Sequence, residues 1–283
     1  MTAVRQIGAA WRAAARRIDR AEARSLLERV SGCTHADLIA HAEREMGDDA
    51  AVRFETLVAR REAGEPLAYL LGSAWFAGHE FTVTPDVLIP RPDTEVLVDL
   101  AVERAHALSS PRVVDLGTGS GIVPVTLALR CPRAQVTAVD ISAAALAVAQ
   151  ANAVRHRASI RFLHGDWYAP LAGERFDLIV SNPPYVAEGD PHLLRDGLPF
   201  EPQQALTDGV PGGEGMACLH AIIAGAGAHL LPGGWLLLEH GYDQAVKVRE
   251  LLAQAAFSDI ASWRDTAGIE RVSGGRLGSG PAG

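Results

Sequence analysis

The chain has little cysteine and no long hydrophobic run. The three cysteines Cys33, Cys131 and Cys218 are widely spaced and odd in number, which excludes a disulfide framework and a CxxC-type zinc site. No stretch of about 18 apolar residues is present, so we expect no membrane span. The N-terminus lacks the apolar stretch of a signal peptide, and Asp19 and Glu22 interrupt the acid-poor pattern of a transit peptide. We therefore expect a cytoplasmic protein.

Positive charge is also scarce. The chain has 26 Lys and Arg residues against 34 Asp and Glu, a net charge of −8. Residues 1–72 contain 11 Arg and 11 acidic residues, so the whole excess lies in residues 73–283, with 15 basic and 23 acidic residues. Proteins that bind a nucleic-acid backbone usually present a basic face. We therefore expect no direct nucleic-acid binding.

The remaining composition is that of a globular protein, with 48% hydrophobic and 21% charged residues over 283 positions. Apolar residues recur at steps of three and four between positions 4 and 30. Thr34 is a candidate N-cap for a helix extending through Met46, and another helix is expected over 50–63. These patterns predict a small helical domain. It has no catalytic cluster, because His35 and His41 lie on different helix faces.

The pattern changes after residue 72. Three short β-like runs separated by turn residues predict a hairpin, at 75–76, 81–83 and 87–89. The prolines of Pro90-Arg91-Pro92 stiffen the chain, and Asp93 or Thr94 is placed to cap the helix that follows.

From residue 112 onward, apolar strands alternate with helices, which predicts a parallel sheet covered on both faces. The expected strands are 112–117, 135–140, 160–166, 176–181 and 234–241, and the expected helices are 121–130, 142–156, 214–230 and 243–256. The last runs, 259–265 and 270–275, are too close together for a helix between them and predict a terminal antiparallel hairpin. The fold class is therefore α/β, with a mostly parallel sheet of seven strands.

A glycine-rich loop, Gly117-Thr118-Gly119-Ser120-Gly121, directly follows the first of these strands and opens a helix. Glycines at such a turn let a ligand approach the backbone closely. A Walker loop would need a following GK[ST], and a dinucleotide loop would need glycine where Ile122 stands. The GxGxG spacing instead matches S-adenosylmethionine-dependent methyltransferases.

Two further side chains follow neighbouring strands at the same sheet edge. Asp140 lies where an acidic side chain reaches a ribose diol; alternatively it caps the next helix, although Ser142 is available for that. Trp167, beside Asp166, suits an adenine ring; alternatively it fills a gap at the rim.

The fourth strand ends in Asn182-Pro183-Pro184-Tyr185. A rigid turn is the simple interpretation, but its place beside the glycine loop favours a role in methylating planar nitrogens. An amide nitrogen is a weak nucleophile, so an enzyme must position it and offer acceptors to its N–H bonds. The side chain of Asn182 and the backbone carbonyl of Pro183 supply acceptors, and the ring of Tyr185 can lie against the planar group. This chemistry needs no metal and no nucleophile.

Together these motifs resemble one family, the bacterial peptide chain release factor glutamine methyltransferases of the HemK type. The resemblance spans nearly the whole chain, through GEPLAYLLG (64–72), LIPRPDTEVLV (88–98), DLGTGSG (115–121), AVD (138–140), SNPPY (181–185), FEP (200–202), LLLEHG (236–241) and ERV (270–272). Pro124 and Ile269 depart from the pattern of the family.

The resemblance implies a helical substrate-docking domain (1–72), a hairpin linker (73–92), a Rossmann-like class I methyltransferase domain (93–276) and a flexible tail (277–283). It implies methyl transfer from S-adenosylmethionine to the glutamine of the Gly-Gly-Gln motif in class I release factors, with S-adenosylhomocysteine as product. The implied residues are Gly117 to Gly121, Asp140, Trp167 and Asn182 for the cofactor, and Asn182 to Tyr185 for the glutamine.

Two other functions stay open at this point. A methyltransferase acting on exocyclic amines of adenine or guanine in nucleic acid shares the SNPPY motif, but it would need a basic face or an added recognition domain. A non-catalytic binding module would keep the fold, but it would have no need of an intact Asn182–Tyr185 motif and Asp140.

Overall fold

The computed structural model describes residues 5–278. The chain forms two compact units. The helical unit contains the chain up to Ser73 together with Leu194–Phe200, and the sheet unit contains Ala74–Leu193 and the chain from Glu201. Within the described residues, no helix is both long and apolar enough to cross a membrane.

The helical unit is built from short helices with well-formed ends. They are α1 (Ile7–Ala14), α2 (Arg20–Ser31), α3 (His35–Ala40), α4 (Asp48–Glu62) and α5 (Leu67–Leu71). Asp19 caps α2 by accepting the N–H groups of Ala21 and Glu22, and Thr34 forms a capping box with Asp37 at the start of α3. The predicted extension of this helix to Met46 is wrong, because α3 ends at Ala40 and the Met46 N–H bonds the carbonyl of Arg5 at 2.8 Å.

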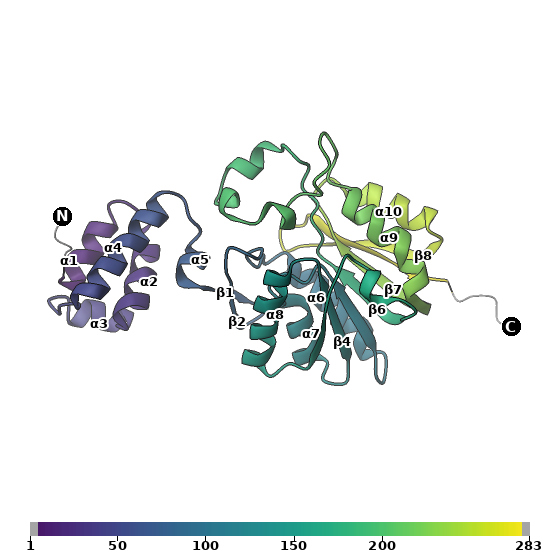
Figure 1. Cartoon of the computed structure of the whole chain (residues 1–283), viewed down its shortest axis with the longest axis horizontal. Helices are drawn as coiled ribbons and strands as arrows, with labels where there is room; N and C mark the ends of the chain where they lie inside the picture. Colours follow the sequence, from purple (N-terminus) through teal and green to yellow (C-terminus); the bar gives the residue numbers. More distant parts are fainter. Residues whose placement is uncertain (1–4, 279–283) are drawn as a thin grey trace. The chain divides into compact units, whose positions relative to one another are not determined.

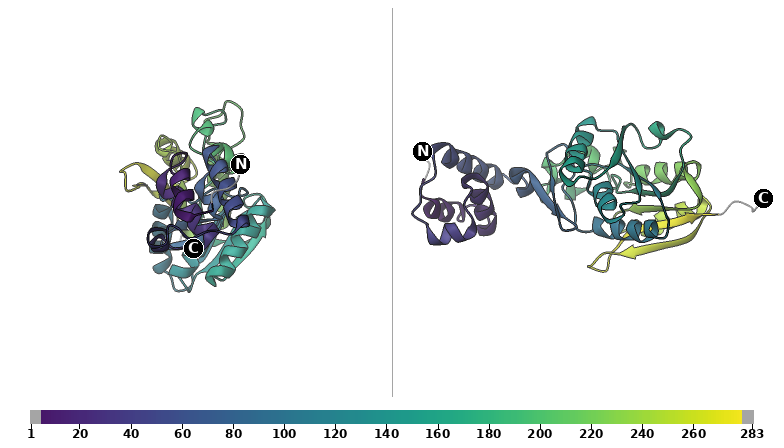
Figure 2. Two further views of the ribbon diagram at one scale, coloured as in Figure 1. Left: turned by 90° about the vertical axis from the view of Figure 1, so that its left-hand side faces the viewer. Right: turned by 90° about the horizontal axis from the view of Figure 1, so that it is seen from below.

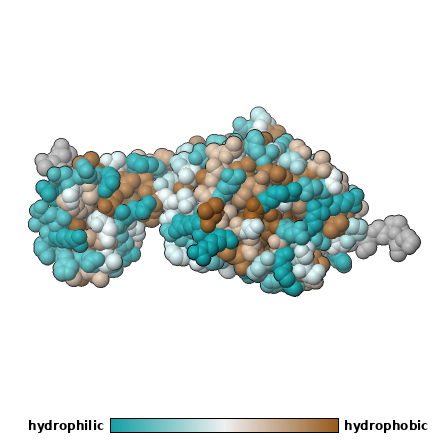
Figure 3. Space-filling view, turned by 60° about the horizontal axis from the view of Figure 1, so that its bottom comes forward, coloured by the Kyte–Doolittle hydropathy of each residue, from teal (hydrophilic) through white to brown (hydrophobic). Residues whose placement is uncertain are grey.

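A compact apolar core holds these helices together. Leu26 and Leu27 of α2 pack with Phe54 and Val58 of α4, and all four are at most 3% exposed. Figure 2 shows the helices of this unit gathered in a bundle. Hydrophilic and hydrophobic side chains are interspersed on the face of the unit that Figure 3 shows.

A hairpin precedes the main sheet. Strands β1 (Ser73–Phe76) and β2 (His79–Thr82) are joined by Ala77 and Gly78, both with positive φ. Such a pair is typical of the tight turns that match strand twist. The third predicted β-like run, 87–89, is not a strand: the Ile89 N–H donates to the carboxylate of Glu201 at 3.0 Å rather than to a neighbouring strand.

The main sheet has seven strands in the order β5-β4-β3-β6-β7-β9-β8. The strands are β3 (Arg112–Leu116), β4 (Gln135–Asp140), β5 (Ile160–His164), β6 (Phe176–Ser181), β7 (Leu230–Glu239), β8 (Phe257–Arg264) and β9 (Glu270–Leu277). The strands from β3 to β7 pair in parallel, and β9 is antiparallel to both β7 and β8. This confirms the predicted fold class, including the terminal hairpin.

Helices cover both faces of this sheet (Figure 1). One face carries α6 (Thr94–His106), α7 (Ile122–Arg130) and α8 (Ala143–His156), and the other carries α9 (Ala217–His229) and α10 (Ala245–Gln254). Short 3-10 turns occur at Ala169–Leu171, Pro191–Leu194, Leu198–Phe200 and Gln203–Ala205. An apolar core lies on each face of the sheet, and consecutive residues of β3 pack into different cores. Val113 packs toward α6 and α7, whereas Val114 packs toward α9 and α10.

Both departures from the family pattern are accommodated locally. Pro124 is the third residue of α7, where a backbone N–H has no partner within the helix, so the helix loses no hydrogen bond. Ile269 lies in the turn between β8 and β9, where its N–H donates to Asp265 Oδ1 at 2.9 Å. β9 ends at Leu277, and most of the tail predicted to be flexible lies outside the described residues.

Thr126 of α7 offers a test of core packing. It is fully buried, and its Oγ1 has no hydrogen-bond partner among the described residues. We expect Thr126→Val, which keeps the shape and removes the unpaired hydroxyl, to raise the free energy of unfolding by about 1–2 kcal/mol in urea titrations. Thr126→Ser is the control, because it keeps the hydroxyl and loses a methyl group, and we expect it to lower stability. Destabilisation by the valine variant would contradict this account.

Candidate active site

The site begins where two parallel strands end side by side. Leu116 of β3 is paired with Ser181 of β6, and the Ser181 hydroxyl donates to the Leu116 carbonyl at 2.5 Å. The glycine loop starts one residue after Leu116, and Asn182 follows Ser181 directly. From β3 the chain crosses to β4 on one side, and β6 pairs with β3 on the other side. The strand order therefore reverses at β3, and open α/β sheets bind ligands at such a position.

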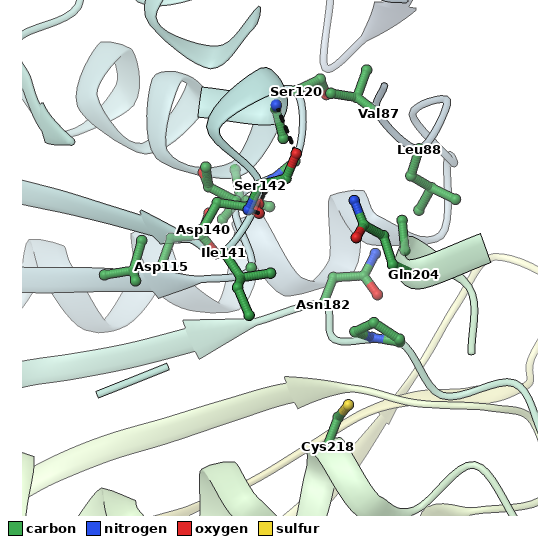
Figure 4. Close-up of a pocket in the computed structure, with 18 of the residues that line it drawn as sticks. Val87, Leu88, Asp115, Ser120, Asp140, Ile141, Ser142, Asn182, Gln204 and Cys218 are labelled. Carbon is green, nitrogen blue, oxygen red and sulfur yellow. Dashed lines mark hydrogen bonds between the residues drawn. The ribbon is translucent and has the colours of Figure 1, made fainter. Parts of the chain in front are cut away.

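A cavity of about 500 Å³ lies at this edge. Figure 4 shows Asp115, Asp140, Ile141 and Ser142 on one side of it, and Leu88, Asn182 and Gln204 on the other. The residues predicted from sequence that line the cavity are Gly117, Thr118, Gly119, Ser120, Asp140, Trp167, Asn182 and Pro184. Gly121, Pro183 and Tyr185 are not part of its lining.

The glycine loop is held by backbone bonds and by one buried asparagine. The N–H groups of Gly117 and Thr118 both donate to the carbonyl of Val139, at 2.9 and 3.0 Å. Asn152 of α8, which is fully buried, donates to the Ser120 carbonyl at 2.8 Å. Gly121 has a φ of +81°, and a Cβ there would lie 3.0 Å from the Cβ of Ala149. Gly121 therefore permits the close packing of α7 on α8.

Asp140 connects this loop to the end of β4. Its Oδ2 accepts the Gly119 N–H and its Oδ1 accepts the Ser142 N–H, both at 2.8 Å. Burial raises its pKa, while these backbone N–H groups favour its charged form. The side-chain cap of α8 comes from Ser142, whose hydroxyl accepts the Ala145 N–H at 3.1 Å. Each Asp140 oxygen keeps a second lone pair, and the residue lines the cavity.

Trp167 lies against the glycine loop, with its ring beside Gly117. It follows β5, has a φ of +39°, and lines the cavity. A Cβ at Gly117 would come within 3.3 Å of the Trp167 ring, so only glycine leaves this approach open. The ring is partly buried against the apolar core, and it lines the cavity as well, so the gap-filling and ligand-facing interpretations both have support.

Asn182 is held by a residue that the sequence did not mark as functional. Its Nδ2 donates to the hydroxyl of Thr94 at 3.2 Å, which leaves its Oδ1 without a hydrogen-bond partner among residues 5–278. Thr94 is the first residue of α6 and is 1% exposed. Tyr185 packs against the apolar core, and its hydroxyl donates to Oε1 of the buried Glu239 at 3.2 Å.

Two segments far apart in the sequence close one side of the cavity. Residues 86–91 and 203–209 both contribute to its lining. Glu201 joins them, because its carboxylate accepts the Ile89 N–H at 3.0 Å and pairs with Arg91. The side chain of Glu201 is 1% exposed, so this ion pair is partly sheltered from water. The FEP and IPRP motifs contain these residues, but the sequence alone gave them no role.

Asp115 is a second residue that sequence reasoning missed. It is 1% exposed and lines the cavity. Its Oδ2 and the hydroxyl of Thr118 are buried without hydrogen-bond partners in the described part of the chain. Burial, together with the nearby charge of Asp140, raises the pKa of Asp115 to about 7.

These features fit S-adenosylmethionine. Asp115 and Asp140 line a cavity whose other walls are largely apolar, and a ligand with ammonium and sulfonium groups would place positive charge near their carboxylates. The backbone at Gly117 and Gly119 is open to close approach. The fold and the site together define a class I methyltransferase.

Comparisons with known proteins agree with this class. Residues 93–195 match the methyltransferase small domain, and residues 2–72 match the PrmC N-terminal domain. A methyltransferase from Pyrococcus furiosus superposes with a TM-score of 0.54 at 19% identity, covering 79% of this chain and 98% of that protein, and shares the fold.

Close relatives define the family. The release factor glutamine methyltransferase of Bordetella pertussis is 53% identical over 261 residues, covering 92% of this chain and 96% of the relative. That of Burkholderia pseudomallei is 49% identical, covering 92% and 93%. The chain belongs to the release factor glutamine methyltransferase family, as its sequence motifs predicted.

The pKa of Asp115 leads to a test. Because its folded pKa is raised above the unfolded value, the folded state binds the proton more tightly, and the wild type loses stability as pH rises from about 4 to about 7. Asp115→Asn has no such loss. We expect the stability of the variant relative to the wild type to increase by about 2–3 kcal/mol between pH 5 and pH 8, measured by urea unfolding. A pH-independent difference would contradict the raised pKa.

Proposed function

We propose that this protein transfers a methyl group from S-adenosylmethionine to the side-chain amide nitrogen of the glutamine in the Gly-Gly-Gln motif of class I peptide chain release factors. The observation that carries this proposal is the position of the Asn182 carboxamide. Asn182 follows β6 and the glycine loop follows β3, and the pairing of these two strands brings them side by side. The Asn182 Oδ1 has no hydrogen-bond partner among the described residues. The names of the relatives and the SNPPY motif both support a planar amide as the acceptor.

The mechanism places the glutamine amide against fixed acceptors. S-adenosylmethionine, when bound, supplies an electrophilic methyl group and leaves as S-adenosylhomocysteine. Asn182 Oδ1 accepts one N–H of the substrate amide, and the backbone carbonyl of Pro183 accepts the other. As positive charge develops on the attacking nitrogen, these dipoles bind it more strongly than they bind the neutral amide. The nitrogen passes its proton to solvent water after the new bond has formed, because a neutral amide is too weakly acidic to be deprotonated first.

The remaining predicted site residues have supporting roles in this proposal. Gly117 to Ser120 let the cofactor approach the backbone, Asp140 accepts from the ribose hydroxyls, and Trp167 covers the adenine. Pro184 forms part of the cavity wall, and Tyr185 supports the substrate amide from the core side. Gly121 contributes through the packing of α7 on α8.

The proposal extends to the partner. The described residues of the helical unit include no catalytic cluster, and the unit has a core of its own. Both features suit a domain (residues 1–72) that docks the release factor, with residues 73–92 as the linker. The paired charges on its surface, such as Arg17 with Glu55 and Glu62, fit a protein partner better than a nucleic acid. The substrate implies a cytoplasmic location. Methyl transfer to an oriented amide has no step that requires a metal ion.

The first test is chemical. Incubating the full chain with S-adenosylmethionine and an intact release factor should add one methyl group to the Gly-Gly-Gln glutamine, as located by peptide mass spectrometry. A release factor with glutamate at that position is the control and should stay unmodified. The reaction should persist in EDTA. Methylation of DNA or ribosomal RNA instead would favour the nucleic-acid alternative, and no transfer to any release factor would overturn the proposal.

The second test concerns Asn182. Replacing it by alanine leaves one substrate N–H unpaired in a site sheltered from water, and loss of such a bond costs about 10²–10³ in turnover. We expect Asn182→Ala to lower kcat at least about a hundredfold, with a smaller change in cofactor affinity. Asn182→Asp keeps an acceptor and should be less damaged. Single-turnover methyl transfer and calorimetry measure the two effects. An alanine variant within threefold of the wild-type rate would show that the motif only shapes the turn.

A further inference from the structure

A buried carboxylate, Glu239, contacts the Asn182–Tyr185 motif through the Tyr185 hydroxyl. Glu239 is the last residue of β7 and is 1% exposed. Its position follows from strand register, because Ser181 of β6 is paired with Leu238 of β7, so Asn182 and Glu239 are the next residues of neighbouring parallel strands. Glu239 does not line the cavity, so it has no direct contact with a ligand there.

Glu239 lies near two hydroxyl groups at the Asn182–Tyr185 motif, those of Tyr185 and Thr94. The Tyr185 hydroxyl donates to its Oε1 at 3.2 Å, and its Oε2 has no hydrogen-bond partner among the described residues. The Thr94 hydroxyl lies close enough to favour the charged form of the carboxylate. The same Thr94 hydroxyl accepts from Asn182 Nδ2 at 3.2 Å.

The charge of Glu239 bears on the direction of these hydrogen bonds. An ionised carboxylate only accepts, so it favours a nearby Thr94 hydroxyl whose hydrogen points toward Glu239. The oxygen of Thr94 must then accept from Asn182, which turns Nδ2 toward Thr94 and leaves Oδ1 free for the substrate N–H. A protonated Glu239 can instead donate to Thr94. Thr94 would then donate to Asn182 Oδ1 and turn the amide donor toward the substrate, where a second donor is useless.

We propose that Glu239 is a positioning residue for methyl transfer, which holds Tyr185 by its hydroxyl and, through Thr94, keeps the Asn182 acceptor turned toward the substrate. This inference rests on the proposed function and deepens it. It assigns a role to the LLLEHG and IPRPDTE motifs, whose residues Glu239 and Thr94 lie outside the cofactor and glutamine residues implied by the resemblance.

The charges around Glu239 set the pH range in which this role is visible. Burial raises the pKa of Glu239 to about 7, opposed by the Thr94 and Tyr185 hydroxyls. Asp93, just before α6, raises it further, while Arg271 of β9 lowers it. Arg271 is itself paired with Asp93 at 3.5 Å and with Asp265 at 3.0 Å. Because the ionised form is the one that orients Asn182, the transfer rate should rise with pH through about 7 and then level off.

The experiment measures single-turnover methyl transfer to an intact release factor from pH 6 to pH 9, at saturating S-adenosylmethionine. Glu239→Gln is isosteric and cannot ionise. We expect its rate–pH profile to lack the inflection near neutral pH. Its rate at pH 8 should be about tenfold below that of the wild type, and its cofactor affinity should stay within about threefold of the wild-type value. Thr94→Val should slow transfer by about tenfold or more, and Thr94→Ser, which restores the hydroxyl, should recover most of the rate.

Two matched controls lie in the same unit. Thr126→Val also removes a buried threonine hydroxyl, and Tyr168→Phe removes a partly buried tyrosine hydroxyl that donates to the Ile222 carbonyl at 2.8 Å. Neither residue lines the cavity, so both variants should keep the wild-type rate and pH profile. A Glu239→Gln enzyme with the wild-type profile, or a Thr94→Val enzyme within threefold of the wild-type rate, would overturn the inference.

A second measurement separates this inference from the proposed function. The side-chain amide resonances of Asn182, assigned by their loss in Asn182→Asp, should titrate near pH 7 in the ¹⁵N spectrum of the wild type and not in Glu239→Gln. An unchanging amide signal in the wild type would overturn the positioning role. If the amide titrates but no release factor is methylated, the proposed function fails and the positioning role of Glu239 stands.

Discussion

The site depends on the parallel pairing of β3 with β6. The two strands carry the glycine loop and the Asn182 motif, and their register places Leu116 beside Ser181. A slip of one residue would turn the buried side chains of either strand toward the opposite face and would move the two loops out of step. The apolar residues of β3, which pack alternately into the two cores, therefore fix the distance between the glycine loop and the Asn182 motif.

The same register extends one strand further. Leu116, Ser181 and Leu238 form a row across β3, β6 and β7. One residue beyond this row stand Gly117 after β3, Asn182 after β6 and Glu239 at the end of β7. The register therefore places the buried carboxylate of Glu239 one strand away from Asn182, although Glu239 does not line the cavity.

Side chains that bond to backbone hold the loops around this edge. Asp140 joins the glycine loop to the start of α8, Asn152 holds the carbonyl of Ser120, and Glu201 holds Ile89 and Arg91. Each is at most 9% exposed, so each bond forms where competing water is scarce. These bonds hold the cavity walls to the sheet and helices, and walls held in this way lower the entropy cost of positioning a weak nucleophile.

The sequence by itself determined the class of fold, the place of the glycine loop and of the Asn182–Tyr185 motif at one edge of the sheet, and the family, because strand periodicity and motif spacing are local properties of the chain. It was wrong where tertiary contacts override local pattern: the N–H of Ile89 bonds a distant glutamate rather than a strand, and the helix predicted to reach Met46 stops at Ala40. Only the tertiary structure brought Thr94 to Asn182 and Tyr185 to Glu239, pairs that lie 88 and 54 residues apart in the chain. Such contacts leave no local signal, because they arise from the order in which the strands and helices pack.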